Sequence, residues 1–261
     1  MSTLIVDASP PRDIKLMDNM EKDKNLTQDW FDRWSNEYDQ TLGKISFHRG
    51  LLDLMVKNSN VNNGDSVLDI GCGTGLLSLK FLRKADCFVT GVDSSREMIA
   101  IFQDKIRKLK LDDKVSLRLM DAASLKFKEG TFNQVVSSVT LHHLKDKLSA
   151  IKRVFKILKK DGALIIGEID MDTTGKLTDT RRLKRILRVL EQEWAPALKD
   201  VGIEAFSRMF ENGKKHILNQ GEYCVSLAQW SEICRRAGFK SIAIKRVGCY
   251  RAFGIVIAKK S

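Results

Sequence analysis

The sequence predicts an α/β domain in which a parallel β-sheet carries helices on both faces. Short apolar segments rich in valine and isoleucine alternate with amphipathic helical segments up to residue 172, which is the pattern that βαβ units produce. A glycine-rich turn, GCGTG at residues 71–75, joins the first strand-like segment to a helix. With 261 residues, of which 43% are hydrophobic, the chain is long enough to bury the core of one large domain of this class.

The predicted elements follow in a regular order. Two helices precede the sheet, at residues 26–43 and 49–60. Strands are expected at residues 65–71, 87–93, 115–122, 132–140 and 162–170, with helices at 75–85, 95–111 and 146–162 between them. Ser94 or Ser95 is a suitable N-cap for the long helix that follows the second strand.

This alternation stops after Asp172. Residues 173–222 contain no clear strand, and we expect a helical insertion there that acts as a lid over a substrate. The polar face of its first helix is basic and would favour an acidic acceptor, although solvation accounts for most such residues: Arg181, Arg182, Lys184, Arg185 and Arg188. We expect a helix at 226–239 and strands at 240–247 and 251–260 to close a domain that spans 29–261, and we expect residues 1–28 to form a polar leader that is mobile.

Composition narrows the class of protein. The five cysteines form no C-x-x-C pair and show no zinc-ligand spacing, so we expect no metal and a reducing, cytoplasmic location. No apolar run is long enough to span a membrane. The net charge of +12 is compatible with an anionic substrate or with nucleic acid.

Three carboxylates at strand ends indicate which ligand the glycine turn accepts. The glycines Gly71, Gly73 and Gly75 form G-x-G-x-G rather than the dinucleotide fingerprint G-x-G-x-x-G. Asp69, just before them, would repel a pyrophosphate and attract an ammonium group. Asp93 ends the second strand, where an acid suits a ribose diol, and Asp121 follows the third strand, where it suits an exocyclic amine. A ligand with an amine, a ribose and an adenine but no phosphate is S-adenosylmethionine.

The motifs also resemble those of a known family. VLDIGCGTG, GVDSSREMI, LMDAASLKF, FNQVVSSVTLHHL and LKKDGALIIGEID are similar, in order and spacing, to the motifs of class I S-adenosylmethionine-dependent methyltransferases. The resemblance is to the small-molecule branch that includes the ubiquinone/menaquinone-biosynthesis methyltransferases. It implies a Rossmann-like sheet of seven strands, mostly parallel, with an antiparallel last strand.

The resemblance assigns a place on the cofactor to each matched residue. It implies that the three glycines hold the methionyl part, that Asp69 holds the amine, and that Asp93 holds the ribose. The remaining implied cofactor residues are Cys72 and Ser94 within the motifs, Met98, Asp121 and Ala122 at the adenine, Thr140 beside the sulfonium, and Tyr38 closing over the cofactor. Two of these residues would also suit a purely structural role, because Cys72 fits a small filler of the loop and Tyr38 fits a core aromatic.

His142 and His143 follow the fourth strand and are the candidate catalytic residues. Either could act as a general base, or His142 could pack in the core while His143 faces solvent. Methyl transfer from a sulfonium can also proceed by positioning alone. The favoured function is methyl transfer to a small molecule. RNA or a protein side chain is the alternative acceptor, although the chain lacks the Asp/Asn-Pro-Pro-aromatic motif of many nucleic-acid enzymes, and a cofactor-binding regulator without turnover is a third hypothesis.

Overall fold

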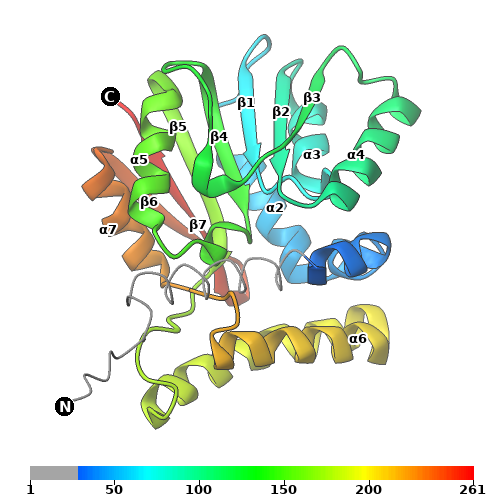
Figure 1. Cartoon of the computed structure of the whole chain (residues 1–261), viewed down its shortest axis with the longest axis vertical. Helices are drawn as coiled ribbons and strands as arrows, with labels where there is room; N and C mark the ends of the chain where they lie inside the picture. The colour runs from blue at the N-terminus through cyan, green and yellow to red at the C-terminus, as the bar shows by residue number, and fades with distance from the viewer. Residues whose placement is uncertain (1–28) are drawn as a thin grey trace, which may run out of the picture.

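The structure is a computed structural model that describes residues 29–261, so the predicted leader lies outside the described residues. Seven strands form one sheet with the order β3-β2-β1-β4-β5-β7-β6 (Figure 1). The parallel part consists of β1 (Ser66–Ile70), β2 (Phe88–Asp93), β3 (Val115–Leu119), β4 (Phe132–Ser138) and β5 (Leu158–Ile169). The strand β7 (Tyr250–Lys259) runs antiparallel to both β5 and β6 (Ser241–Val247). The predicted fold class is therefore confirmed.

Helices cover both faces of this sheet. On one face, α5 (Lys147–Ile157) and α7 (Leu227–Ala237) pack against each other over a core that contains Trp230. On the other face lie α2 (Ser46–Asn58) and α3 (Leu76–Lys84), while α4 (Arg96–Leu109) packs on β2 and β3. Short 3₁₀ turns complete the domain: η1 (Leu42–Lys44), η2 (Ala122–Ser124) and η3 (Leu141–His143). Of the two serines predicted to cap α4, Ser95 does so, with its Oγ accepting from the Met98 N–H.

The predicted boundary between the helix after the fourth strand and the fifth strand was wrong. The sequence suggested that the helix after the fourth strand runs to Gly162, but α5 ends at Ile157 and β5 begins at Leu158. The reason is tertiary, because Leu158 pairs with Phe132 at the start of β4. A ladder partner far away in the sequence thus overrides the local helical pattern.

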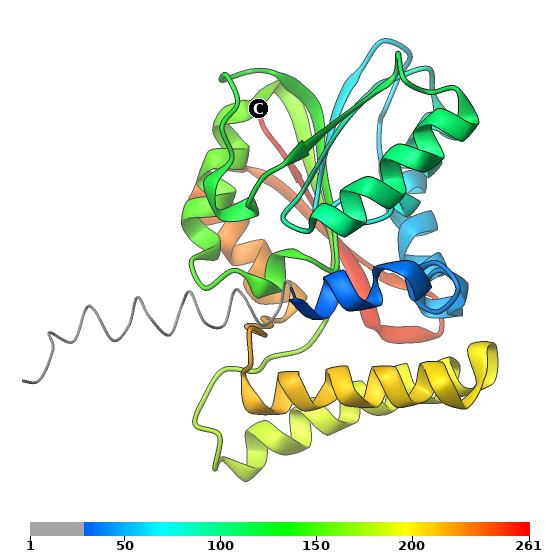
Figure 2. The same cartoon turned by 45° about the vertical axis from the view of Figure 1, so that its right-hand side comes forward.

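The insertion is helical, as predicted, and consists mainly of α6 (Thr180–Leu218). Gly202 has non-helical dihedral angles, φ 80° and ψ −172°, and there the helix turns back on itself. The two arms lie side by side below the carboxyl edge of the sheet, next to the helix at residues 29–38 (Figure 2). No helix within residues 29–261 is both long and apolar enough to cross a membrane.

Arg182 is an exception to the expectation that most of the basic residues of this helix are solvated, and it does not lie on the predicted polar face. Its side chain is fully buried, and its guanidinium donates to the carbonyls of Thr173, His216 and Ile217. It therefore satisfies carbonyl groups at the end of the second arm that would otherwise be orphaned. Arg182 joins the two arms rather than selecting an acceptor.

Candidate functional site

The glycine turn lies at the carboxyl edge of the sheet, directly after β1. Its three glycines have positive φ angles of 70°, 51° and 88° at Gly71, Gly73 and Gly75, a region that disfavours other residues. A Cβ atom on Gly71 would lie 2.2 Å from the Thr140 Oγ1, and one on Gly75 would lie 2.3 Å from the Phe102 ring. A Cβ atom on Gly73 would have its nearest neighbour, the Met98 Sδ, 4.0 Å away. Of the three glycines, Gly73 alone leaves space for a ligand to approach the backbone.

The carboxylate of Asp93 holds the turn in shape. Its Oδ2 accepts from the Gly73 N–H at 2.8 Å and its Oδ1 accepts from the Ser95 N–H at 2.9 Å. Burial raises the pKa of this carboxyl, against the lowering effect of the backbone N–H groups. Each oxygen retains a lone pair, so an acid at this position can organise the loop and bind a diol at the same time.

The helix at residues 29–38 and the turn that follows it are attached to this edge by two hydrogen bonds. The Ser95 hydroxyl donates to Asp32, and the Thr74 hydroxyl donates to the Asp39 Oδ1 at 2.5 Å. Lys105 of α4 reinforces the second contact, since it pairs with Asp39 and donates to the Thr74 carbonyl at 2.7 Å. The helix and the glycine turn therefore form one connected unit.

Asp69 lies beneath the turn. Its carboxyl group is buried, accepts a hydrogen bond from the Ser78 hydroxyl at 2.6 Å, and has a pKa raised to about 7 by burial. Tyr38 is half-buried above it, and burial together with Asp93, Asp39 and Asp69 raises the pKa of its phenol. That Asp69 holds a cofactor amine and that Tyr38 covers the cofactor stay predictions.

The other predicted cofactor residues line the same edge. Asp121 and Ala122 are half-exposed after β3, where the Asp121 Oδ1 accepts from the Ala123 N–H at 2.8 Å. Thr140 donates to the Ser138 carbonyl at 3.0 Å. Cys72 and Met98 are buried, and Ser94 lies between β2 and α4. The structure thus brings these residues together, and their contacts with a cofactor stay a prediction.

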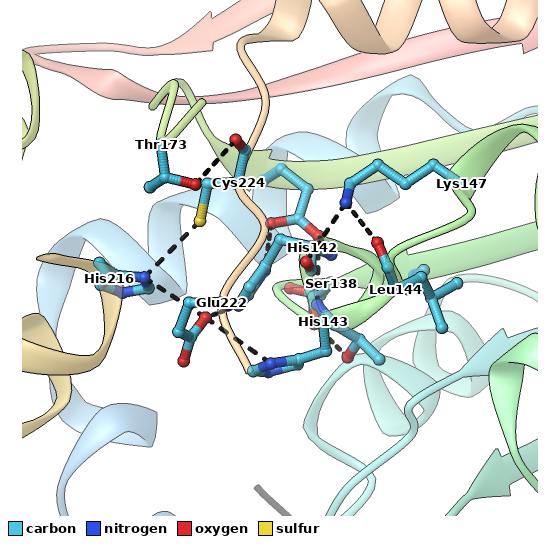
Figure 3. Close-up of polar contacts among 12 residues, drawn as sticks. Ser138, His142, His143, Leu144, Lys147, Thr173, His216, Glu222 and Cys224 are labelled. Atoms are coloured by element: carbon cyan, nitrogen blue, oxygen red, sulfur yellow. Dashed lines mark hydrogen bonds and ion pairs between the residues drawn. The ribbon is translucent and has the colours of Figure 1, made fainter. Parts of the chain in front are cut away.

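The histidine pair belongs to a buried group of ionisable side chains, the polar cluster, which contains His142, His143, Glu168, His216, Glu222 and Cys224 (Figure 3). His142 is 3% exposed. Its Nδ1 lies 2.8 Å from the Glu168 Oε2 and its Nε2 lies 3.0 Å from the Glu222 Oε2. Burial lowers the pKa of His142, but the two carboxylates outweigh it and raise the pKa to about 10. His142 is therefore held as a cation rather than as a base.

His143 is the better candidate for a base. Its Nδ1 lies 2.9 Å from the Gly221 carbonyl, and because a carbonyl only accepts, Nδ1 carries the proton and Nε2 keeps its lone pair. Burial lowers the pKa of His143 to about 4, so its ring is neutral at pH 7. The sequence offered both histidines equally as candidate bases. In the structure their surroundings shift the two pKa values in opposite directions, up for His142 and down for His143.

A narrow cavity of about 40 Å³ lies against His143. The helix at residues 29–38 supplies aromatic walls, and α6 supplies the side opposite: Trp30, Phe31, Trp34 and Tyr38, with Glu193, Met209 and Asn212. Burial raises the pKa of Glu193 to about 7. Val139 also lines the cavity and has φ 50°, a strained backbone for a β-branched residue.

Sequence analysis missed four members of the polar cluster: Glu168, His216, Glu222 and Cys224. Glu168 lies in a strand of otherwise apolar residues. An acidic residue in such a strand could have indicated a functional role. His216, Glu222 and Cys224 follow one another closely at the end of the insertion. Nothing in their spacing connects them to the histidine pair, which lies more than 70 residues earlier.

Comparison with known proteins identifies this architecture. Residues 67–162 match the family described as "Methyltransferase domain". The chain is 28% identical over 148 residues to 27-O-demethylrifamycin SV methyltransferase of Amycolatopsis mediterranei, covering 54% of each chain. It is 31% identical over 157 residues to a ubiquinone/menaquinone biosynthesis C-methyltransferase of Blochmanniella floridana, covering 59% of this chain and 62% of the relative. The chain thus spans about half the length of these curated relatives.

A solved structure shares the fold. Phosphoethanolamine N-methyltransferase 2 of Haemonchus contortus, in complex with S-adenosyl-L-methionine, superposes with a TM-score of 0.64 at 18% identity. The match covers 88% of this chain and 57% of that one. Residues 67–162 thus carry a methyltransferase domain, in agreement with the resemblance of the motifs.

Proposed function

The chain belongs to the class I S-adenosylmethionine-dependent methyltransferases, and we propose that it transfers a methyl group from this cofactor to a small organic acceptor bound in the aromatic cavity. The observation that carries the proposal is the position and size of that cavity. It lies beside the carboxyl edge that carries the glycine turn, and its volume of about 40 Å³ holds only a few water molecules. A narrow space of this kind, widened by movement of one wall, favours a small acceptor over a polymer.

The residues at the turn fit the cofactor. Gly73 leaves its backbone open to a ligand, Asp93 keeps lone pairs for ribose hydroxyls, and the Asp69 carboxyl would become ionised beside an ammonium group. When bound, S-adenosylmethionine supplies an electrophilic methyl group. Asp69, Gly73 and Asp93 would hold it, and Tyr38 would exclude water from above.

His143 would accept the acceptor's proton. Its Nε2 is the basic nitrogen, its ring is fixed by the Gly221 carbonyl, and the ring also lines the cavity. The edge of the Phe31 ring packs against it at a centroid distance of 5.6 Å, which orients the imidazole towards the aromatic wall. A neutral, oriented imidazole is available as a general base, and its low pKa suits an acceptor with a readily lost proton.

The helix at residues 29–38 and α6 would act as a lid. The cavity is too small to admit an organic acceptor unless one of these walls moves, and closure over the substrate would then exclude water. Lid motion predicts that cofactor alone protects the glycine turn from hydrogen exchange, while acceptor further protects residues 173–222. Unchanged exchange in α6 with a turning-over acceptor would contradict the lid.

The acceptor atom is an open part of the proposal. The Blochmanniella floridana relative is named a C-methyltransferase and the Haemonchus contortus protein an N-methyltransferase, so similarity does not select one atom. The decisive experiment supplies methyl-labelled S-adenosylmethionine to the purified chain with a fractionated cell extract. Label in a metabolite fraction supports the proposal, whereas label confined to RNA or protein would replace it with the macromolecular alternative. The free cysteines are compatible with a cytoplasmic location, which is part of the proposal.

A further inference from the structure

Three potential metal ligands converge where the chain returns from α6 to the core. His216 lies in the last turn of α6, and Glu222 and Cys224 lie in the segment that follows. Their side chains are 1%, 2% and 2% exposed. The His216 Nδ1 lies 3.3 Å from the Glu222 Oε2 and 3.6 Å from the Cys224 Sγ (Figure 3).

Hydrogen bonding alone does not account for this arrangement. One ring nitrogen can share one proton, so Nδ1 satisfies either the carboxylate or the sulfur. The Glu222 Oε2 is buried without a hydrogen bond of standard geometry among the described residues, and such a group is costly unless something else binds it. The His216 Nε2 is also buried without a partner there, but an ion at Nδ1 would not bind it.

The distances match those between ligands of a tetrahedral zinc ion. With zinc bonds of about 2.0–2.1 Å to nitrogen or oxygen and about 2.3 Å to sulfur, neighbouring ligand atoms lie about 3.3 Å apart for a nitrogen–oxygen pair and about 3.6 Å for a nitrogen–sulfur pair. The measured distances are 3.3 Å and 3.6 Å. We propose that the His216 Nδ1, the Glu222 Oε2 and the Cys224 Sγ bind a zinc ion.

The surroundings support a metal centre. The His142 Nε2 lies 3.0 Å from the Glu222 Oε2, and the His142 Nδ1 lies 2.8 Å from the Glu168 Oε2. Glu222, the carboxylate ligand, is therefore held in place by His142, which is in turn held by Glu168. Metal ligands in proteins are commonly oriented by neighbouring groups in this way. A mixed nitrogen, oxygen and sulfur set suits zinc better than magnesium or calcium. Cys224 also lines an open groove of about 380 Å³, which provides a path for entry.

This site goes beyond methyl transfer and does not depend on it. Three protein ligands leave a fourth coordination position for water or another ligand. The ion would fix the return of the insertion beside His142. The expectation of no metal rested on the absence of C-x-x-C pairs and of zinc-ligand spacing in the sequence. A ligand set that contains a single cysteine is not detected by that criterion.

Metal analysis and cobalt substitution test the proposal. The whole chain, purified without a histidine tag, should retain about one zinc per molecule after dialysis. Replacement by Co²⁺ should produce a thiolate-to-cobalt charge-transfer band. Cys224→Ala should remove that band, and His216→Ala should weaken metal affinity by about 100-fold or more.

Two control variants separate the site from other thiols. Cys249→Ala changes an exposed cysteine and Cys234→Ala changes a buried one in α7, and both should keep the band. Less than about a tenth of a zinc per chain after reconstitution, or a cobalt spectrum without sulfur coordination in the wild type, would overturn the proposal even if the variants failed to fold. So would wild-type metal affinity in a folded Cys224→Ala variant.

Discussion

The glycine turn and the polar cluster occupy the same edge of the sheet but are built in opposite ways. The turn is contiguous, since its glycines and Asp69 lie within seven residues, and the next strand supplies Asp93. The cluster combines side chains from η3, from β5, from the last turn of α6 and from the segment after α6. Local geometry thus specifies the proposed cofactor side of the site, whereas tertiary packing creates the proposed acceptor side.

The largest effect is expected from Gly71→Ala, which breaks the local half of this comparison. The new Cβ would meet the Thr140 side chain at 2.2–2.6 Å, at a φ angle of 70°. We expect a loss of about 3–5 kcal/mol of stability from overpacking and backbone strain, with cofactor binding abolished. Gly130→Ala is the control, because its φ is 64° with nothing within 4 Å, and it should cost only about 1 kcal/mol. Chemical denaturation measures both, and equal losses would show that packing on Thr140 is unimportant.

Asp69→Asn tests whether the buried carboxyl of Asp69 destabilises the folded protein when it is ionised. The folded pKa of Asp69 is about 7, above the ordinary value of 3.8, so ionisation opposes folding as pH rises through this window. The penalty is absent below pH 3.8 and complete above pH 7. At pH 8 the variant should therefore be more stable by up to about 4 kcal/mol, yet bind the cofactor more weakly.

Thermal unfolding between pH 4 and pH 8 checks this prediction. Asp112→Asn, which changes an exposed carboxyl, should leave the pH dependence unaltered. If Asp69→Asn follows the wild-type curve throughout, the carboxyl is not protonated in the folded protein.

These predictions also show how far sequence alone could go. The order of strands, the insertion and the edge that carries Asp69, Asp93 and Asp121 were predictable, because each depends on local periodicity or on the ends of parallel strands. The end of α5 was not, because Leu158 is recruited by Phe132. Glu222 was not either, because only the folded hairpin of α6 carries it to His142. The sequence also cannot show which of two adjacent histidines is a buried cation and which is a neutral base.

His143→Gln sharpens the comparison on the acceptor side. Glutamine can still donate to the Gly221 carbonyl, but it cannot accept the acceptor's proton at neutral pH. Methyl transfer should fall by about 100-fold, about 2.7 kcal/mol, with cofactor affinity unchanged. The check is kcat together with calorimetric cofactor affinity. Retained turnover would leave positioning as the mechanism.

The smallest effects are expected from Asp93→Asn and its companion variant Asp121→Asn. The amide keeps one oxygen but turns an N–H donor towards a backbone N–H, so cofactor affinity should fall by about 10-fold. Asp121→Asn is the companion variant at the half-exposed end of the site, where the same change should matter less because water competes for the hydrogen bond. Calorimetric titration ranks the two, and the reverse ranking would exchange the ribose and adenine assignments.

The two hydrogen bonds that attach the helix at residues 29–38 to the glycine turn have a kinetic consequence. Asp32 and Asp39 hold this helix to Ser95 and Thr74, and the same helix forms the aromatic wall of the cavity. Ordering the turn with cofactor would therefore complete the wall before an acceptor arrives. Steady-state measurements should show a compulsory order, in which the demethylated cofactor is a competitive inhibitor against S-adenosylmethionine and leaves last.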